Sequence, residues 1–590
     1  MMTPQEIRTL ILETVSRNGG HLASSLGAVE IAVALYETFD ARKDRIVWDV
    51  GHQAYAWKIL TGEGRQPFST LRRLDGLSPF PNPSESVADA AVAGHAGVSI
   101  SVAAGLAAAR DRRGSDEQVV AVVGDGALVN GTSLEALNNL AVATEKLIVV
   151  LNDNEMSISR PAGSLAKLLG RLITSVRYNR MKTAAENAGH RLGLTFLRHA
   201  YHRLESRIKS WFLGNAFFEQ FGLRYIGPVD GHDLSALKSA LTVAKEDKRS
   251  VLVHVVTKKG KGYGPAEQDP TAWHGVGPFP RGEVAAGERA ASREGQSWSG
   301  AFGKALCEFA RHDGRVVALT AGMKDGTGLA EFAREFPERF YDVGIAEGHM
   351  VSFAAGLAAG GRRPVVAVYS TFLQRAVDQV MHDVCIAGLP VVFCFDRAGV
   401  VGADGVTHQG LYDIALLRTF PNLTICQPKD ADDLKALLDE ALARSGPTVI
   451  RYPRGSVPDA ARAAGLAAAS PAAPPPAPRH SFAIWATGDQ LPKARAVAAR
   501  ITGAEVVFAR MIKPFDRALL ERQRAAGRRI VSIENGAVAG GFGESIGADL
   551  RFGWPDVFIP HGSVAELERR YGFDADAIVA AIRRFDSSPS

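Results

Sequence analysis

The sequence predicts an α/β protein with three units, each a mainly parallel sheet flanked by helices. Short apolar runs rich in β-branched residues alternate with stretches of helical periodicity, as in the run at 119–123, the helical stretch 132–143 and the run at 147–151. At 590 residues the chain is too long for a single hydrophobic core. Segments 281–297 and 457–480 have the composition of linkers, so we expect the units to cover residues 1–287, 297–457 and 481–590.

In the first unit, residues 5–40 have a helical pattern that the Gly-containing segment 17–27 interrupts. A short strand is expected at 44–49, and the sheet resumes with apolar runs at 223–233 and 251–257. These runs alternate with helical patterns along the chain. We therefore expect a parallel sheet in this unit.

Residues 157–215 contain no clear strand and carry many more basic than acidic side chains. A nucleic-acid-binding patch is one interpretation of this charge. No recognised nucleic-acid motif accompanies it, so a solvated helical or mobile insertion is the favoured interpretation. We expect no nucleic-acid partner.

The second and third units repeat the alternation of apolar runs and helical patterns. In the second unit, strands are expected at 316–320, 340–343, 365–369, 391–395, 423–426 and 448–451. In the third, smaller unit, strands are expected at 482–486, 506–509, 530–533 and 557–559. The third unit lacks a concentrated set of catalytic residue types.

The composition is that of an ordinary globular protein, with 46% hydrophobic and 22% charged residues. The net charge of +5 suits anionic small substrates without requiring nucleic acid. No stretch is apolar for long enough to span a bilayer, and the N-terminal residues lack the apolar core of a signal peptide. We therefore expect a cytoplasmic protein without a membrane partner. The cysteines lack metal-ligand spacing, and they are Cys307, Cys385, Cys394 and Cys426.

Oxygen-bearing side chains follow two of the predicted strands of the first unit. Gly124-Asp125-Gly126-Ala127 ends the run at 119–123, and Asn154 follows the run at 147–151. In an open parallel sheet, ligands bind at the carboxyl ends of the strands. Asp125 and Asn154 suit Mg²⁺, which prefers oxygen ligands and often shares them with phosphate. The glycines let the backbone approach a diphosphate closely.

Three histidines next to glycines, His21, His52 and His95, precede this turn at the ends of predicted elements. A single such histidine is more often a cap or a core residue than a functional group. Three of them near a candidate metal and phosphate motif favour a functional role instead.

The motifs as a set resemble those of thiamine diphosphate enzymes of the transketolase group, and of 1-deoxy-D-xylulose-5-phosphate synthases in particular. The resemblance covers nearly the whole chain. It is carried by the segments 48–55, 124–154, 151–159, 225–233, 369–375, 396–399, 401–410 and 451–455. It implies three transketolase-like domains: a diphosphate-binding domain, a pyrimidine-binding domain and a C-terminal domain.

The resemblance implies an activity, which is the decarboxylative joining of pyruvate to glyceraldehyde 3-phosphate. The product would be 1-deoxy-D-xylulose 5-phosphate, a precursor of isoprenoids, thiamine and pyridoxal, and the cofactors would be thiamine diphosphate and Mg²⁺. Glu347 matches the glutamate that bonds the pyrimidine ring and promotes proton removal from the cofactor. Its alternative reading is a carboxylate that only stabilises a helix N-terminus. Phe372 matches the ring that stacks on the pyrimidine, and Arg375 lies one helical turn further.

The remaining roles are assigned by the same resemblance. The expected cofactor-binding residues are His52, His95, Gly124, Asp125, Gly126, Ala127, Asn154, Met156, Ile158, Glu347, Phe372 and Arg375, of which Asp125, Asn154 and the carbonyl of Met156 would hold the metal. The expected catalytic residues are Glu347, His21, His52, His274, His408 and Asp404. The expected substrate-binding residues are Tyr369, Arg397, Arg454 and His408, with the two guanidinium groups holding the acceptor phosphate. Either arginine alone could equally form a surface salt bridge.

Several positions depart from the family pattern, namely Ala96, Gly97, Gly322 and Gly348. The last two would enlarge or loosen the site if they line it. The acceptor therefore stays open, and the alternatives are a related carboligase or transketolase with another aldehyde or donor, or a non-catalytic relative. Members of the family are homodimers, so we expect a homodimer here.

Overall fold

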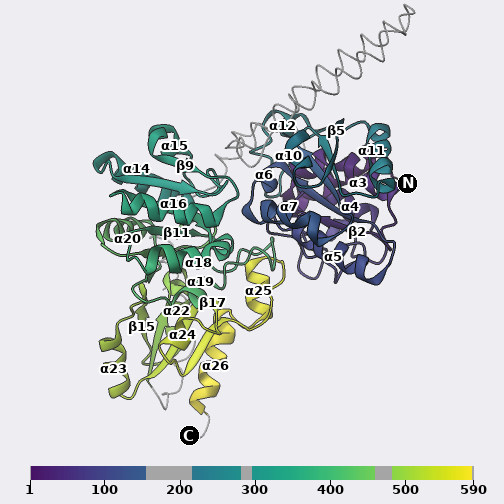
Figure 1. The fold of residues 1–590 in the computed structure, drawn as a ribbon. Coiled ribbons are helices and arrows are strands. Elements are labelled where there is room, and N and C mark those ends of the chain that lie inside the picture. Colours follow the sequence, from purple (N-terminus) through teal and green to yellow (C-terminus); the bar gives the residue numbers. More distant parts are fainter. Residues whose placement is uncertain (1, 155–214, 281–295, 459–480, 588–590) are drawn as a thin grey trace, which may run out of the picture. The chain divides into compact units, whose positions relative to one another are not determined.

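The computed structural model describes residues 2–154, 215–280, 296–458 and 481–587. The predicted insertion at 157–215 and the two predicted linkers lie outside these residues, apart from their ends. The chain separates into two compact units. The first comprises Met1–Arg72 and Gly76–Arg289, and the second comprises Arg73–Asp75 and Ala290–Ser590. Figure 1 shows the elements of each unit, and each is described by itself.

A five-stranded parallel sheet forms the centre of the first unit, in the order β2-β3-β4-β6-β5. Its strands are β2 (Arg45–Trp48), β3 (Val119–Gly124), β4 (Ile148–Asp153), β5 (Arg224–Asp230) and β6 (Val251–Val256), which confirms the predicted strands. β3 and β4 are buried almost throughout, as expected for central parallel strands covered on both faces. Gly124 is paired with Asn152, so the two strands end at the same edge.

Helices surround this sheet (Figure 1). They are α1 (Pro4–Asn18), α2 (Leu22–Gly27), α3 (Val29–Thr38), α4 (Tyr55–Leu60), α5 (Ser99–Arg113), α6 (Asp125–Leu128), α7 (Gly131–Ala143), α10 (Asn215–Glu219), α11 (Leu234–Glu246) and α12 (Gly264–Gln268). The predicted interruption of the early helical pattern is real. It contains β1 (Gly20–His21), which pairs with β7 (Gly275–Val276) in a two-stranded antiparallel sheet that we did not predict.

The second unit contains a seven-stranded sheet in the order β16-β12-β13-β11-β10-β8-β9. The predicted strands are all present, as β8 (Val316–Thr320), β9 (Phe340–Asp342), β10 (Arg363–Tyr369), β11 (Val392–Asp396), β12 (Thr424–Cys426) and β13 (Thr448–Arg451). β16 (Met511–Lys513) comes from the region predicted as the third unit, and it pairs with β12 in antiparallel fashion. It covers an otherwise exposed edge strand of three residues. The division into three domains therefore stays a prediction, because the chain separates into two units.

A four-stranded parallel sheet, in the order β15-β14-β17-β18, also belongs to the second unit. Its strands are β14 (Phe482–Ala486), β15 (Glu505–Phe508), β17 (Arg529–Ala537) and β18 (Leu550–Trp554). The strand predicted at 557–559 was wrong. Val557 and Phe558 are exposed loop residues, and the last strand is instead β18, whose apolar residues alternate with Arg551 and Gly553.

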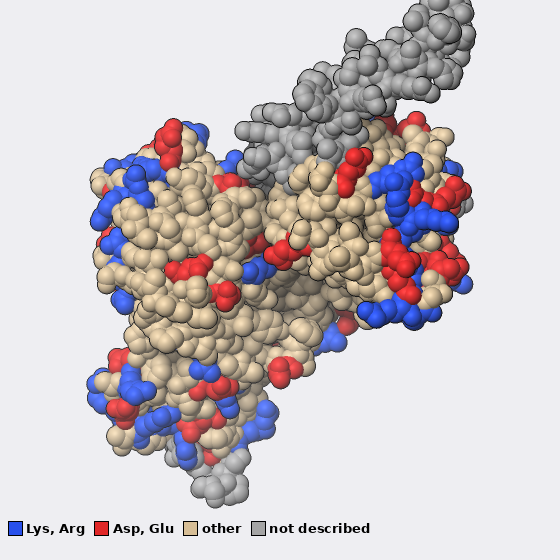
Figure 2. All heavy atoms as spheres, viewed as in Figure 1, with Lys and Arg blue, Asp and Glu red and all other residues tan. Residues whose placement is uncertain are grey.

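The main helices of the second unit lie beside these sheets (Figure 1). They are α14 (Trp298–His312), α15 (Ala330–Glu335), α16 (Glu347–Ala359), α17 (Ser370–Leu373), α19 (Asp413–Leu417), α20 (Ala431–Ala443), α22 (Leu491–Ala498), α23 (Arg517–Ala525), α24 (Phe542–Ser545), α25 (Val564–Arg570) and α26 (Ala575–Ser587). Figure 2 shows acidic and basic side chains interspersed on the visible faces. Among the described residues, no helix is both long and apolar enough to cross a membrane.

Candidate functional site

Three of the predicted histidines, His21, His52 and His274, form a cluster in the first unit. The ring centroids of His21 and His274 are 5.6 Å apart, those of His52 and His274 are 5.4 Å apart, and those of His21 and His52 are 6.1 Å apart. The pairing of His21 in β1 with Gly275 in β7 brings residues more than 250 positions apart into contact. The sequence identified the histidines, but not the small sheet that gathers them.

Two imidazoles of this cluster, those of His52 and His274, are held in the neutral form. Burial and the charge of Lys259 lower the pKa of His52 to about 3. Burial lowers the pKa of His274 well below its usual range, with smaller contributions from Lys259 and the neighbouring histidines. Nδ1 of His274 lies 3.2 Å from the hydroxyl of Ser24. At neutral pH these rings can donate and accept hydrogen bonds, but they carry no charge.

The Gly-Asp-Gly turn lies where β3 ends, and Asp125 is the first residue of α6. Asp125 is 6% exposed, and burial together with the charge of Asp153 raises its pKa to about 7. Gly124 has open space where a Cβ would stand, so a ligand can approach the backbone there. Asn154 is described and follows β4, whereas Met156 and Ile158 lie outside the described residues.

Lys259 is a functional candidate that the sequence reading missed. Its side chain is buried, and burial lowers its pKa to about 8, against the opposing effect of Asp125. The loop at 258–263 is polar and Gly-rich, and its sequence does not distinguish Lys259 from its neighbours Lys258 and Lys261. Burying an ammonium and a carboxylate costs free energy that their mutual attraction repays only in part. A bound cation beside Asp125 and an anionic group beside Lys259 would compensate both charges.

The loop that carries His95 is fixed by hydrogen bonds to its backbone. The carboxylate of Asp49 accepts from the N–H groups of Gly97 (2.8 Å) and Ser99 (2.9 Å). The hydroxyl of Ser133 donates to the carbonyl of Ala127 at 2.9 Å and lies 3.2 Å from that of Gly97. Gly97 has φ +79°, and a Cβ there would lie 2.6 Å from Asn130. The backbone at this position, which departs from the family pattern, therefore requires glycine.

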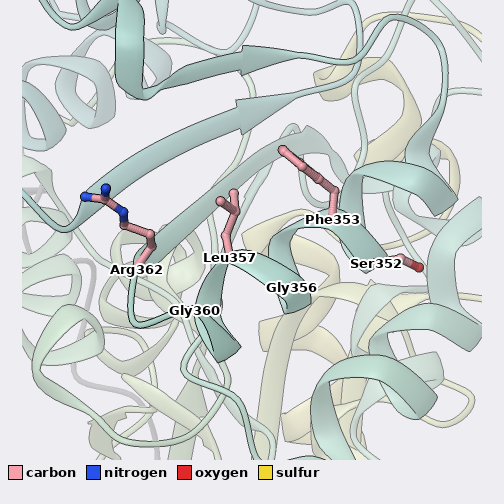
Figure 3. Close-up of a pocket in the computed structure, with 6 residues that line it drawn as sticks. All are labelled: Ser352, Phe353, Gly356, Leu357, Gly360 and Arg362. Carbon is pink, nitrogen blue, oxygen red and sulfur yellow. The ribbon is translucent and has the colours of Figure 1, made fainter.

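Glu347 begins α16 in the second unit and is 3% exposed. Burial raises the pKa of its carboxyl, and Arg375 opposes this effect from 3.7 Å away. A pocket of about 470 Å³ lies further along the same helix (Figure 3). It contains no carboxylate or histidine and forms no part of the predicted site; its lining residues are Ser352, Phe353, Gly356, Leu357, Gly360 and Arg362.

A chain of ring contacts connects the predicted pyrimidine-side and acceptor residues. The Phe372 ring lies 5.5 Å from that of His408, edge to face, and 5.8 Å from that of Tyr369. The guanidinium of Arg397 lies over the Tyr369 ring at 3.8 Å from its centroid. Arg397 has φ +60°, which is uncommon for a residue with a side chain and occurs often at functional sites.

Arg454 joins this group through the loop at 399–410. Its Nη1 lies 3.1 Å from Oδ2 of Asp404 and 3.4 Å from the carbonyl of Val401. Nδ1 of His408 lies 2.9 Å from the hydroxyl of Thr407. The contacts of the second unit thus join its predicted site residues in groups: Glu347 with Arg375, Phe372 with Tyr369, His408 and Arg397, and Arg454 with Asp404.

The departures at Gly322 and Gly348 differ in their structural basis. Gly322 has φ +74° and donates its N–H to Asp342 at 2.7 Å, so its backbone favours glycine. A Cβ at Gly348 would meet the side chain of Gln379 at 3.5 Å, an ordinary contact. A small side chain would fit there.

The family model described as 1-deoxy-D-xylulose-5-phosphate synthase matches residues 2–257. The transketolase pyrimidine-binding and C-terminal domain models match residues 294–459 and 476–578. A 1-deoxy-D-xylulose-5-phosphate synthase from Geobacter metallireducens is 46% identical, over 98% of this chain and 95% of its own. The chain belongs to the 1-deoxy-D-xylulose-5-phosphate synthase family. A synthase from Desulforudis audaxviator is also 46% identical, over 97% of this chain and 93% of its own.

Among solved structures, a transketolase from Leishmania mexicana aligns over 100% of this chain and 99% of its own, with 19% identity and a TM-score of 0.42. Membership of the synthase family implies thiamine diphosphate as the cofactor. The described residues fit this group. In the first unit they provide a buried carboxylate, a buried ammonium and open space beside Gly124, and in the second a buried glutamate paired with Arg375.

Gly326 offers a steric test of the tyrosine beneath Arg397. A Cβ at this position would lie 1.9 Å from the hydroxyl of Tyr369, so Gly326→Ala must displace the ring. We expect the KM for the aldehyde substrate to rise roughly tenfold, since the Arg397–Tyr369 contact is lost. Steady-state kinetics with varied aldehyde measures this. Gly356→Ala is the control, because a Cβ there meets open space; equal kinetics of both variants would contradict the prediction.

Proposed function

We propose that this protein joins pyruvate to glyceraldehyde 3-phosphate with loss of CO₂ and forms 1-deoxy-D-xylulose 5-phosphate. The observation that carries the proposal is 46% identity to a named synthase over 98% of the chain. The retained acceptor residues of the second unit, from Tyr369 to Arg454, support it. The relatives reported above are synthases of this same product, and neither supports the alternative with another acceptor.

When bound, thiamine diphosphate supplies a nucleophilic carbon and an electron sink for decarboxylation. We propose that Asp125, Asn154 and the carbonyl of Met156 hold Mg²⁺. Lys259 offers its charge to the diphosphate, and the backbone at Gly124, Gly126 and Ala127 allows close approach. His95, Ile158 and Arg375 complete the expected set of cofactor contacts.

The carboxyl of Glu347 is proposed to hold and exchange a proton with the pyrimidine ring, against which Phe372 packs. Burial supports this role, because it raises the pKa of Glu347 and so favours the protonated form over that of an exposed glutamate. His21 and the neutral rings of His52 and His274 bond substrate oxygens and move protons between them. His408 performs the same task beside Phe372, and Asp404 positions Arg454.

The aldehyde's phosphate is proposed to bind the guanidinium groups of Arg397 and Arg454, since planar guanidinium forks match phosphate oxygens. Arg454→Met should raise the KM for glyceraldehyde 3-phosphate by roughly 10- to 100-fold, the scale expected for the loss of one charge-assisted hydrogen bond. The KM for pyruvate should change less than threefold. Arg315→Met, which removes a surface pair with Asp313, is the matched control. An equal rise in both KM values would show that Arg454 supports the structure of the site in general rather than binding the phosphate.

One experiment tests the proposed reaction directly. The protein receives pyruvate, thiamine diphosphate, Mg²⁺ and one of several aldehydes, while CO₂ release is followed and the product is identified by mass. We expect the fastest turnover with glyceraldehyde 3-phosphate. Turnover with another aldehyde and none with glyceraldehyde 3-phosphate would refute the proposal in favour of the alternative carboligase.

Assembly and location are part of the same proposal. We propose a homodimer, as the family resemblance implies, and a cytoplasmic enzyme whose product feeds isoprenoid synthesis. The named relatives are bacterial proteins, which supports a cytoplasmic location. Analytical ultracentrifugation of the holoenzyme measures the assembly.

A further inference from the structure

The loop at 399–410 carries two proposed site residues, Asp404 and His408. Gly399 and Gly410 close it at the base, because each donates its N–H to the carbonyl of the other at 2.7 Å. The site side of the loop holds Arg454 through Asp404 and Val401. The opposite side packs on residues that follow β14, which have no proposed catalytic role.

Asn535, in β17, holds the base of this loop. Its Oδ1 accepts from the N–H of Val400 (3.1 Å) and from the indole of Trp554 (3.0 Å), and its Nδ2 donates to Asp489 (2.9 Å). Its carbonyl accepts from the fully buried Arg451 at 2.9 Å. Every polar group of the Asn535 side chain is therefore used, and Val400 is the contact that reaches the loop.

Three glycines of the loop lie too close to Asn535, Gly562 and His561 for a larger side chain to fit without displacement. A Cβ at Gly399 would lie 2.1 Å from Nδ2 of Asn535, and one at Gly402 would lie 2.8 Å from the carbonyl of Gly562. A Cβ at Gly405 would lie 3.1 Å from Cβ of His561. All three glycines also have positive φ, so both the backbone and the contact require them.

Gln409 provides a second attachment. It is 2% exposed, and its Oε1 accepts from the N–H of Val401 at 2.7 Å. Its Nε2 lies 3.1 Å from the carbonyl of Pro560 and 3.4 Å from that of Ile559. One side chain thus ties the interior of the loop to the segment after β18.

We propose that Asn535 and Gln409 are positioning residues that set the loop and, through Asp404 and Val401, the guanidinium of Arg454. Arg454 needs such support because its side chain is 41% exposed and has many accessible rotamers. The C-terminal sheet would then determine selectivity for a phosphorylated aldehyde, although it contributes no group that touches substrate. This inference rests on the proposed function of Arg454.

Two measurements on Asn535→Ala in the full-length holoenzyme test the inference. The first is amide hydrogen exchange of the peptide covering 399–410, which should accelerate several-fold because Val400 loses its acceptor. The second is the ratio of kcat/KM for glyceraldehyde 3-phosphate to that for D-glyceraldehyde, which lacks the phosphate. This ratio should fall roughly tenfold, the scale of one or two lost hydrogen bonds.

Ile578→Ala is the matched control. It removes a fully buried side chain of α26 from the core beside the same sheet, so it lowers the melting temperature without removing a hydrogen bond to the loop. Its selectivity ratio should stay within twofold of the wild-type value. Gln409→Leu, which keeps the size but loses both attachments, should reproduce the effect of Asn535→Ala.

The outcomes separate the inference from the proposed function. Unchanged exchange at 399–410 in both loop variants, or faster exchange with an unchanged ratio, overturns the positioning role. An equal fall of the ratio in Ile578→Ala also overturns it, because general destabilisation would then be sufficient. Failure of the wild-type enzyme to use glyceraldehyde 3-phosphate refutes the proposed function, while the exchange result still decides whether Asn535 anchors the loop.

Discussion

Replacing Glu347 with glutamine should lower the turnover of pyruvate and glyceraldehyde 3-phosphate by roughly 10³-fold, the usual scale for losing an acid–base group. The substitution keeps the size of the side chain and removes its ability to exchange a proton. Burial raises the pKa of this carboxyl, which favours the proton-bearing form that proton exchange requires. CO₂ release under saturating cofactor measures the loss, and calorimetry should find thiamine diphosphate binding within about tenfold of wild type.

The alternative explanation for Glu347 is a carboxylate that stabilises the N-terminus of α16. In that case glutamine would lower the melting temperature slightly and leave turnover intact. Glu331→Gln supplies the control, because Glu331 occupies the first turn of α15, is about half exposed and has no proposed role. Turnover of Glu347→Gln equal to that of the control would show that the proton-exchange role is wrong.

Central strands were predictable because burial on both faces leaves continuous apolar runs, as in β3 and β4. β18 was missed because only one residue in two is apolar. The apolar triplet 557–559 that follows it has the composition of a strand, but it lies in a loop where only Ile559 is buried. The two-residue strands β1 and β7 are too short to have a pattern of their own. They form because the fold brings these distant segments together, and a local sequence pattern does not predict such a contact.

The predicted site residues were found through motifs, and the structure adds those that act through tertiary contacts. Lys259 is buried, whereas its neighbour Lys258 is exposed and pairs with Glu267, and the sequence of a polar loop does not specify which lysine is buried. Gly326 owes its importance to one close neighbour, Tyr369, and Asn535 to the hydrogen bond that it accepts from Val400. Spacing along the chain predicts residues that share an element, but not contacts between elements far apart in sequence.

Asp125→Asn should have opposite effects on the activity and on the stability of the protein without cofactor. Activity should fall at least 100-fold, because a neutral amide replaces a charged ligand of Mg²⁺. Without Mg²⁺, the native carboxylate is buried near Asp153 and its pKa is raised to about 7. A carboxyl with a raised folded-state pKa destabilises the fold progressively as the pH rises from its unfolded pKa to its folded one. At pH 8 that cost is fully present, so the neutral amide should raise the melting temperature by a few degrees.

CO₂ release from pyruvate and glyceraldehyde 3-phosphate measures the activity, and thermal unfolding at pH 8, repeated with and without thiamine diphosphate and Mg²⁺, measures the stability. The wild-type protein should gain stability from the ligands, since they bind only the folded state. Asp125→Asn should begin higher and gain little. Asp116→Asn is the control, because Asp116 is exposed and its carboxyl pairs with Lys43 on the surface. If Asp125→Asn keeps the full ligand-dependent gain in stability, Asp125 is not a metal ligand. If Asp125→Asn melts at a lower temperature than the wild type without ligands, the charge of Asp125 is already compensated within the protein.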